Sequence, residues 1–151
     1  MTGQGRVEFF RRSMGVLGAA FFVGGFLFLI FPDQFIQMTN WFPRGGAAAA
    51  PVVSPASPPR LWPILTFTMM MMIAAISGLN WLDPRKYHGW VPLLLFAKAC
   101  SSLTGLLVFW LSSTGYLADL LSFLTDFPIF LFVLVIYLRA RPELAEPRLA
   151  A

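Results

Sequence analysis

Four long apolar runs place the strongest constraint on how this chain folds. A bilayer core about 30 Å thick needs about 20 apolar helical residues to cross it, and four segments meet that need: residues 14–31, 61–82, 91–111 and 117–138. Only 12% of all residues are charged, whereas a water-soluble domain carries about a quarter. Because lipid offers no partner to open backbone groups, each run is expected to form a helix. The sequence therefore predicts an all-α integral membrane protein, with residues 1–151 as one four-span domain.

Basic residues predict the orientation of the four spans. Eight lysines and arginines flank the spans on the side of both termini and the second connection, against two in the first connection. Positive charge collects in cytoplasmic loops, so both termini are expected in the cytoplasm. The basic residues form no continuous stripe, and nucleic acid is not expected as a partner. We expect the inner (plasma) membrane of a bacterial cell, with the lipid bilayer as the surrounding partner.

The first connection, on the predicted periplasmic side, has two parts. Residues 33–42, DQFIQMTNWF, place apolar side chains at helical spacing, which favours a short helix on the membrane surface. Residues 43–60 are rich in Ala, Pro and Ser, a composition with little means of forming a packed core. We expect residues 43–60 to form a flexible loop that holds no cofactor.

Small residues spaced by four predict where the helices touch one another. In lipid, helices associate through close backbone approach, which Gly, Ala and Ser allow. The candidates are Gly15 with Ala19, Ala20 with Gly24, Ala74 with Gly78, and Ala97 with Ser101 and Gly105. The second and third connections are short, which places consecutive spans side by side. These features predict a compact four-helix bundle with antiparallel neighbours.

Lys98 is the most unusual residue of the third span, because it lies about 10 Å inside the predicted cytoplasmic end. An ionisable side chain at such a depth is costly and normally faces protein or water. Ser101 and Ser102 fall on or near the same face of the helix, at offsets of three and four. This group of polar residues is a candidate functional site.

A second polar stripe runs along the fourth span. Asp119, Ser122 and Asp126 follow one another at offsets of three and four, which places them on one side of a helix. Asp119 is expected near the periplasmic surface. Asp126 is expected about 18 Å from the cytoplasmic end, near the bilayer centre.

Three hypotheses account for Lys98. Its long side chain either returns to the cytoplasmic headgroups, or forms a static ion pair with Asp126 or with another subunit, or takes part with Asp126 in a proton or ion relay. Asp126 has an alternative role of its own. Pro128 removes a backbone donor, which favours a break in the span, and at such a break Asp126 either caps the start of the inner helix or forms part of a transporter-type binding site.

The sequence contains no recognisable catalytic motif. It has no Gly-x-Ser-x-Gly elbow, no Walker loop and no His-Glu-x-x-His motif, and the loops are too short to build a soluble active site. We therefore expect no enzyme. A single histidine and a single cysteine exclude a bis-histidine haem and a Cys-x-x-Cys metal site within one chain, so neither a metal nor another cofactor is expected.

Two functional hypotheses remain. The first is a small non-catalytic membrane protein that acts through helix–helix contacts with itself or with a larger membrane complex, as an accessory or assembly subunit. The second is a small proton- or ion-coupled transporter or channel that uses Lys98, Asp119 and Asp126, with Ser101, Ser102 and Ser122 as further polar groups. Four short spans enclose little volume, so the second hypothesis requires several copies of the chain.

Overall fold

The computed structural model describes residues 3–35, 61–111 and 117–145, and every regular element in these ranges is a helix. The long helices are α1 (Gly3–Ile30), α3 (Leu61–Leu82), α5 (Val91–Leu111) and α6 (Leu117–Ala145). Each contains a stretch long and apolar enough to cross a membrane. The prediction of an all-α protein with four such helices is confirmed. The predicted surface helix 33–42, apart from residues 33–35, and the predicted loop 43–60 lie outside the described residues.

Two of the helices are longer than their apolar runs. α1 begins eleven residues before the predicted span, and α6 continues past residue 138 to Ala145. The added first turns of α1 are polar, and Glu8 forms ion pairs there with Arg11 and Arg12, three and four residues along the helix. Such pairs stabilise a helix that lipid does not surround.

A tight turn joins α3 to α5. It consists of α4 (Pro84–Tyr87) followed by the 3₁₀ turn η1 (His88–Trp90). The side chain of Asp83 caps α4 by accepting a hydrogen bond from the backbone nitrogen of Lys86 at 3.2 Å, and Pro84 takes the first helical position, where its missing donor is harmless. The turn therefore fixes the start of α5 close to the end of α3.

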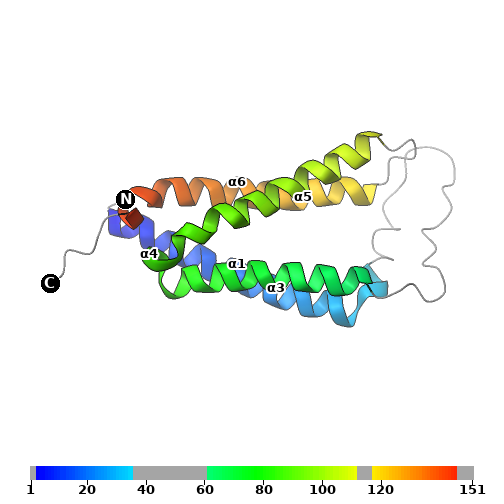
Figure 1. Ribbon diagram of the computed structural model, residues 1–151, viewed down its shortest axis with the longest axis horizontal. Helices are drawn as coiled ribbons and strands as arrows, with labels where there is room; N and C mark the ends of the chain where they lie inside the picture. The colour runs from blue at the N-terminus through cyan, green and yellow to red at the C-terminus, as the bar shows by residue number, and fades with distance from the viewer. Residues whose placement is uncertain (1–2, 36–60, 112–116, 146–151) are drawn as a thin grey trace.

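The four long helices form two pairs. α1 packs along α3 and α5 packs along α6, while α1 also contacts α6 and α3 contacts α5 over a smaller area. In Figure 1 the two pairs lie together at the end where α1 begins, α6 ends and α4 sits, and they stand apart toward the other end. At the first end, Arg6 Nη2 of α1 lies 3.4 Å from Glu143 Oε1 of α6.

The buried side chains gather at this first end. We call it the closed half, and define it as residues 3–21, 73–102 and 133–145. Its buried apolar core is drawn from all four long helices and comprises Phe10, Met14, Phe21, Ile73, Ile76, Val91, Leu94, Leu95, Val133, Ile136, Tyr137, Ala140 and Leu144. The helices therefore meet around one shared core in the closed half.

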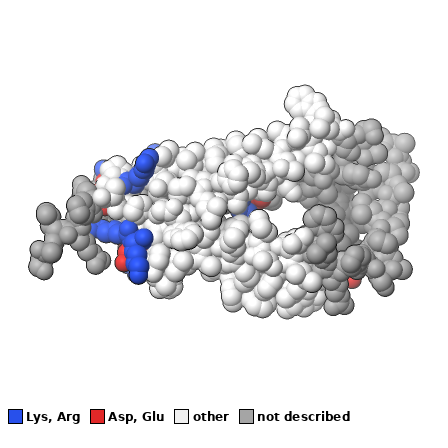
Figure 2. Space-filling view, in the orientation of Figure 1, with Lys and Arg blue, Asp and Glu red and all other residues white. Residues whose placement is uncertain are grey.

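The rest of the described helices form the open half, defined as residues 22–30, 63–72, 103–111 and 120–132. Here most described side chains are exposed or only partly buried, and the fully covered positions are Gly25 and Gly105. Figure 2 shows an opening between the two helix pairs on this side of the core, with basic and acidic surface meeting at its inner edge. The opening therefore lies in the open half, and a charged site lies at its inner edge.

Candidate functional site

Lys98 lies on the inner face of α5. The buried residues of this helix are Val91, Leu94, Leu95, Lys98, Ser102 and Gly105, which recur at the three- and four-residue spacing of one helix face. The Lys98 side chain is 7% exposed. Its backbone carbonyl accepts a hydrogen bond from Ser102 Oγ at 2.7 Å. The Ser102 hydroxyl, which belongs to the predicted polar group, therefore bonds within α5.

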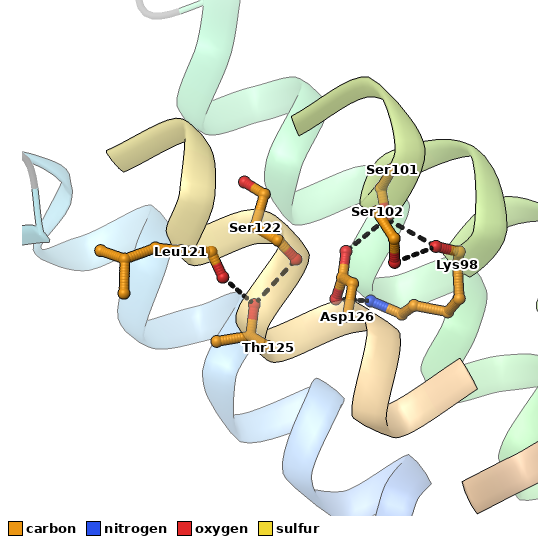
Figure 3. A network of polar contacts seen from close by, with 7 residues as sticks. All are labelled: Lys98, Ser101, Ser102, Leu121, Ser122, Thr125 and Asp126. Carbon is orange, nitrogen blue, oxygen red and sulfur yellow. Dashed lines mark hydrogen bonds and ion pairs between the residues drawn. The ribbon is translucent and has the colours of Figure 1, made fainter. Parts of the chain in front are cut away.

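Asp126 of α6 is the partner of Lys98. The Lys98 ammonium nitrogen Nζ donates to Asp126 Oδ1 at 2.6 Å, and Ser101 Oγ donates to the other carboxylate oxygen, Oδ2. Figure 3 shows the three side chains converging between α5 and α6. Lys98 therefore pairs with Asp126 instead of extending to the headgroups, and both carboxylate oxygens are held by α5.

α1 completes the surroundings of the ion pair. The ring of Phe21 lies under the ammonium group of Lys98, with 4.3 Å from Nζ to the ring centroid. An aromatic face attracts a cation within about 6 Å, and more strongly where water is excluded. Side chains from α1, α5 and α6 thus meet at Lys98, which joins the two helix pairs at the boundary between the closed and open halves.

The expected break in the fourth span is wrong. α6 is assigned as one helix from Leu117 to Ala145, with Pro128 inside it. Pro128 removes one backbone hydrogen bond, but Asp126, the residue expected to cap a new helix, has its carboxylate engaged by α5 instead. Thr125 lies three residues before Pro128, and its Oγ1 donates to the carbonyl of Leu121 at 2.8 Å. This bond adds to the hydrogen bonding of the helix ahead of the proline.

Ser122, the other residue of the predicted polar stripe whose side chain the structure describes, does not join the ion pair. Ser122 is exposed on α6, and the side chain of Asp119 lies outside the described residues. Of the five predicted polar residues whose side chains the structure describes, three are in mutual contact, namely Lys98, Ser101 and Asp126, while Ser102 bonds to the Lys98 backbone.

The predicted small-residue contacts are found at some positions and not at others. A Cβ atom added to Gly15 would lie 2.8 Å from Trp81 Cδ1, and one added to Gly24 would lie 3.0 Å from Met70 Cε, so both glycines face α3. Ala19 and Ala20, by contrast, are exposed. On α5, Gly105 is buried, whereas Ala97 and Ser101 are partly buried.

At Gly18 the backbone of α1 closely approaches the backbone of α3, and this role of Gly18 was not predicted. A Cβ atom there would lie 3.3 Å from the carbonyl oxygen of Ala74, the backbone nitrogen of Gly78 and Ser77 Cβ. Ala74 and Gly78 thus contribute backbone to the contact, although a Cβ added to Gly78 itself would meet nothing within 4 Å. Gly25, seven residues after Gly18, is also buried against α3. The seven-residue spacing of Gly18 and Gly25 in the sequence indicates one helix face, which pairs of small residues four apart do not reveal.

Two buried polar side chains of α3 were also not predicted. Ser77 and Asn80 are fully buried, and within the described part of the chain Ser77 Oγ and Asn80 Oδ1 have no hydrogen-bond partner, whereas Asn80 Nδ2 donates to the carbonyl of Ile76 at 2.9 Å. A polar residue inside an apolar run is itself a signal, because burying an unpaired polar atom costs free energy. These two atoms lie in the closed half, where α3 faces the shared core.

The positive charge of Lys98 and the negative charge of Asp126 neutralise each other. Each charge has the other as its neighbour, and hydroxyl and aromatic groups occupy further positions around them. Among the described residues, no three His, Cys, Asp or Glu side chains gather as a metal site requires.

Comparison with protein families, curated proteins and solved structures finds no matching family model, no matching curated protein and no matching solved structure.

Proposed function

We propose that this chain is a small non-catalytic membrane protein that acts through helix–helix contacts, as an accessory or assembly subunit of a membrane complex or as a homo-oligomer. In this proposal it forms a four-helix bundle in the inner membrane of a bacterium, with both termini in the cytoplasm. The observation that carries the proposal is the outer face of α1, which offers a close-packing surface that the described part of the chain leaves uncovered.

The outer face of α1 consists of Val16, Ala19, Ala20 and Val23. All four are exposed, Val16 to 73%, and their spacing of three and four residues places them on one side of the helix. Small side chains allow the backbone of a second helix to approach closely, which is the main source of association in lipid. We call these four residues the α1 outer face.

Other exposed surfaces of the protein carry larger side chains. On α5, Phe96 and Leu103 are 67% and 62% exposed, and on α6 the exposed residues include Phe132 and Leu138. Such surfaces keep a neighbouring helix at a greater distance and are suited to lipid chains. This contrast in side-chain size supports the α1 outer face as the contact surface. The opposite side of α1 already packs against α3 through Gly18 and Gly25.

The Lys98–Asp126 contact supports the same function. A charge that carries ions or protons has to exchange partners, whereas Lys98 and Asp126 are bonded to each other, with Ser101 and Phe21 as further contacts, and join the two helix pairs. Removing one partner of such a buried pair is strongly destabilising, which ties α5 to α6. The pair is therefore assigned a structural role.

Charge distribution supports the proposed orientation. In Figure 2 basic surface gathers at the end of the molecule where α1 begins and α6 ends. Among the basic residues in that region, Arg85, Lys86, Arg139 and Arg141 are exposed. Basic residues at one end of a set of membrane helices favour the cytoplasmic side.

The proposal is tested by blocking the α1 outer face. Ala20→Leu places a bulky side chain where a partner helix approaches, and Ala75→Leu makes the same change at an exposed alanine of α3. Each variant is purified in mild detergent, and co-purifying proteins and oligomer mass are determined by mass spectrometry. We expect Ala20→Leu to lose the associated partner or oligomer and Ala75→Leu to retain it.

Two results would count against this function. One is equal association in both variants, which would remove the role of the α1 outer face. The other is a proton or ion flux in proteoliposomes that the wild-type protein carries and Lys98→Met abolishes. The second result would support the transporter hypothesis instead.

A further inference from the structure

The carboxylate of Asp126 is the more accessible partner of the ion pair. Its side chain is 19% exposed, against 7% for Lys98. A carboxylate offers about four acceptor positions, and the described part of the chain supplies two donors to it, Lys98 Nζ and Ser101 Oγ. Acceptor capacity therefore remains on the side that Lys98 and Ser101 do not cover.

This remaining capacity lies where the opening ends. Figure 2 shows acidic and basic surface together at the inner edge of the opening, and Lys98 and Asp126 form the ion pair about a third of the way along α5 and α6, counted from the start of each helix. Asp126 lies nine residues, or about 14 Å, along α6 from Leu117. A group that enters through the open half reaches an acceptor at the inner end of an apolar passage.

Charge restricts what such a group is. An ammonium group at Asp126 would lie close to the ammonium of Lys98, 2.6 Å from the same carboxylate, and a carboxylic or phosphoric anion would lie beside the Asp126 carboxylate. Like charges at such distances repel strongly where the dielectric constant is low. A neutral hydroxyl avoids both repulsions and donates one hydrogen bond to the unused acceptor position.

The side chains around the opening indicate that the rest of the ligand is apolar. Side chains of the open half are overwhelmingly apolar, as in the segments FVGGFLFLI of α1 and LTGLLVFWL of α5. Moving a phospholipid headgroup to this depth costs several kcal/mol because its charges lose water. A hydrocarbon chain that ends in a single hydroxyl has no such cost and matches both the walls and the inner end.

We propose that the opening between the helix pairs binds a neutral apolar alcohol, with its hydroxyl donating to Asp126. The ligand belongs to the class of long-chain or polyisoprenoid alcohols and enters from the surrounding lipid. The site is separate from the α1 outer face, so this proposal stands independently of the proposed function. Lys98 and Ser101 hold the carboxylate in position, and the hydroxyl supplies the donor on its uncovered side.

The test compares two photoreactive probes in phosphatidylcholine nanodiscs that contain the full-length wild-type protein. One is a long-chain alcohol with a diazirine near its hydroxyl, and the other is the methyl ether of the same molecule, which cannot donate. After irradiation, labelled peptides are identified by mass spectrometry. We expect the alcohol to label the peptides around Lys98 and Asp126 about five-fold more than the ether, the advantage that one hydrogen bond confers.

Two variants locate the effect. The double variant Lys98→Met with Asp126→Leu removes both charges together, and we expect the alcohol-to-ether ratio to fall to about one. Thr104→Val removes an exposed hydroxyl of α5 in the open half, and we expect it to retain the wild-type ratio. Circular dichroism and gel filtration establish that each variant is folded.

Equal labelling by alcohol and ether in the wild-type protein would overturn the proposal without reference to any variant, and would mean that lipid chains or water occupy the opening. A double variant that is folded and retains the five-fold preference would overturn it as well. Loss of the preference in Thr104→Val would move the site away from Asp126 and have the same consequence.

Discussion

The open half is the more apolar of the two halves, and yet its helices approach one another less closely than those of the closed half. In the closed half all four long helices share one core, whereas in the open half most side chains face outward. Lipid chains are as apolar as leucine, so hydrophobicity does not draw helices together within a membrane. The closed half is instead held by the close approach at Gly18, the capped turn at Asp83 and the ion pair of Arg6 with Glu143.

Polar groups are also distributed differently between the halves. The closed half buries the uncharged polar residues Ser77, Asn80 and Ser102, and Ser77 and Asn80 each have an oxygen without a hydrogen-bond partner among the described residues. The charged pair lies at the boundary, where α5 and α6 remain in contact while the two helix pairs separate. Directional contacts therefore determine where the molecule closes and where it opens.

The largest expected effect is that of removing one charge at the boundary. Lys98→Met leaves Asp126 without its cation, and breaking a buried pair costs about 3–5 kcal/mol. We expect this loss in the free energy of unfolding, measured by denaturation in mixed micelles. Adding Asp126→Leu should recover most of it, because the double variant contains no uncompensated charge. A single variant as stable as the wild type would show that the boundary does not depend on the pair.

A smaller effect separates the two halves directly. Leu94 is 1% exposed in the closed half and Leu107 is 57% exposed in the open half of the same helix. Leu94→Ala removes packed atoms and should cost about 2–4 kcal/mol. Leu107→Ala exchanges one lipid-facing apolar surface for another and should change stability by less than about 0.5 kcal/mol. The same unfolding assay measures both, and equal losses would show that the open half is packed in the membrane.

The smallest expected effect concerns a single hydroxyl. Ser101→Ala removes a donor to the Asp126 carboxylate across two helices, and we expect a loss of about 1 kcal/mol. Ser102→Ala is the matched control, because Ser102 donates only within α5, to the carbonyl of Lys98. Its loss should be smaller. The reverse order would indicate that the local geometry of α5, and not its contact with α6, stabilises the boundary.

The sequence predicts the long helices well because the membrane sets their length. For α3 and α5 the apolar runs 61–82 and 91–111 coincide with the observed helices. The polar first turns of α1 are not apparent in hydropathy, since ion pairs at Glu8 and a contact with α6 support them. Helix ends that leave the lipid depend on tertiary contacts that a single run of sequence does not contain.

The candidate site could be predicted in part. Spacing predicts Lys98 with Ser101 on one face of α5 and Asp126 on a polar stripe of α6, and the pairing of Lys98 with Asp126 is one of three hypotheses, whereas the bond from Ser101 to Asp126 was not predicted. The break at Pro128 was expected because local capping chemistry favours it, but the partner on α5 takes the carboxylate of Asp126 instead. Phe21 was not predicted, because nothing in the order of residues indicates which aromatic ring of another helix lies beside Lys98.

The contact between Arg6 and Glu143 has a consequence for biosynthesis. It joins the first long helix to the last, across almost the whole chain. During synthesis α1 and α3 emerge early and are able to pair at once, and α5 and α6 follow as a second pair. The first helix has to wait for residue 143 before this contact forms, so the end of the molecule that is most firmly packed is also the last to be completed.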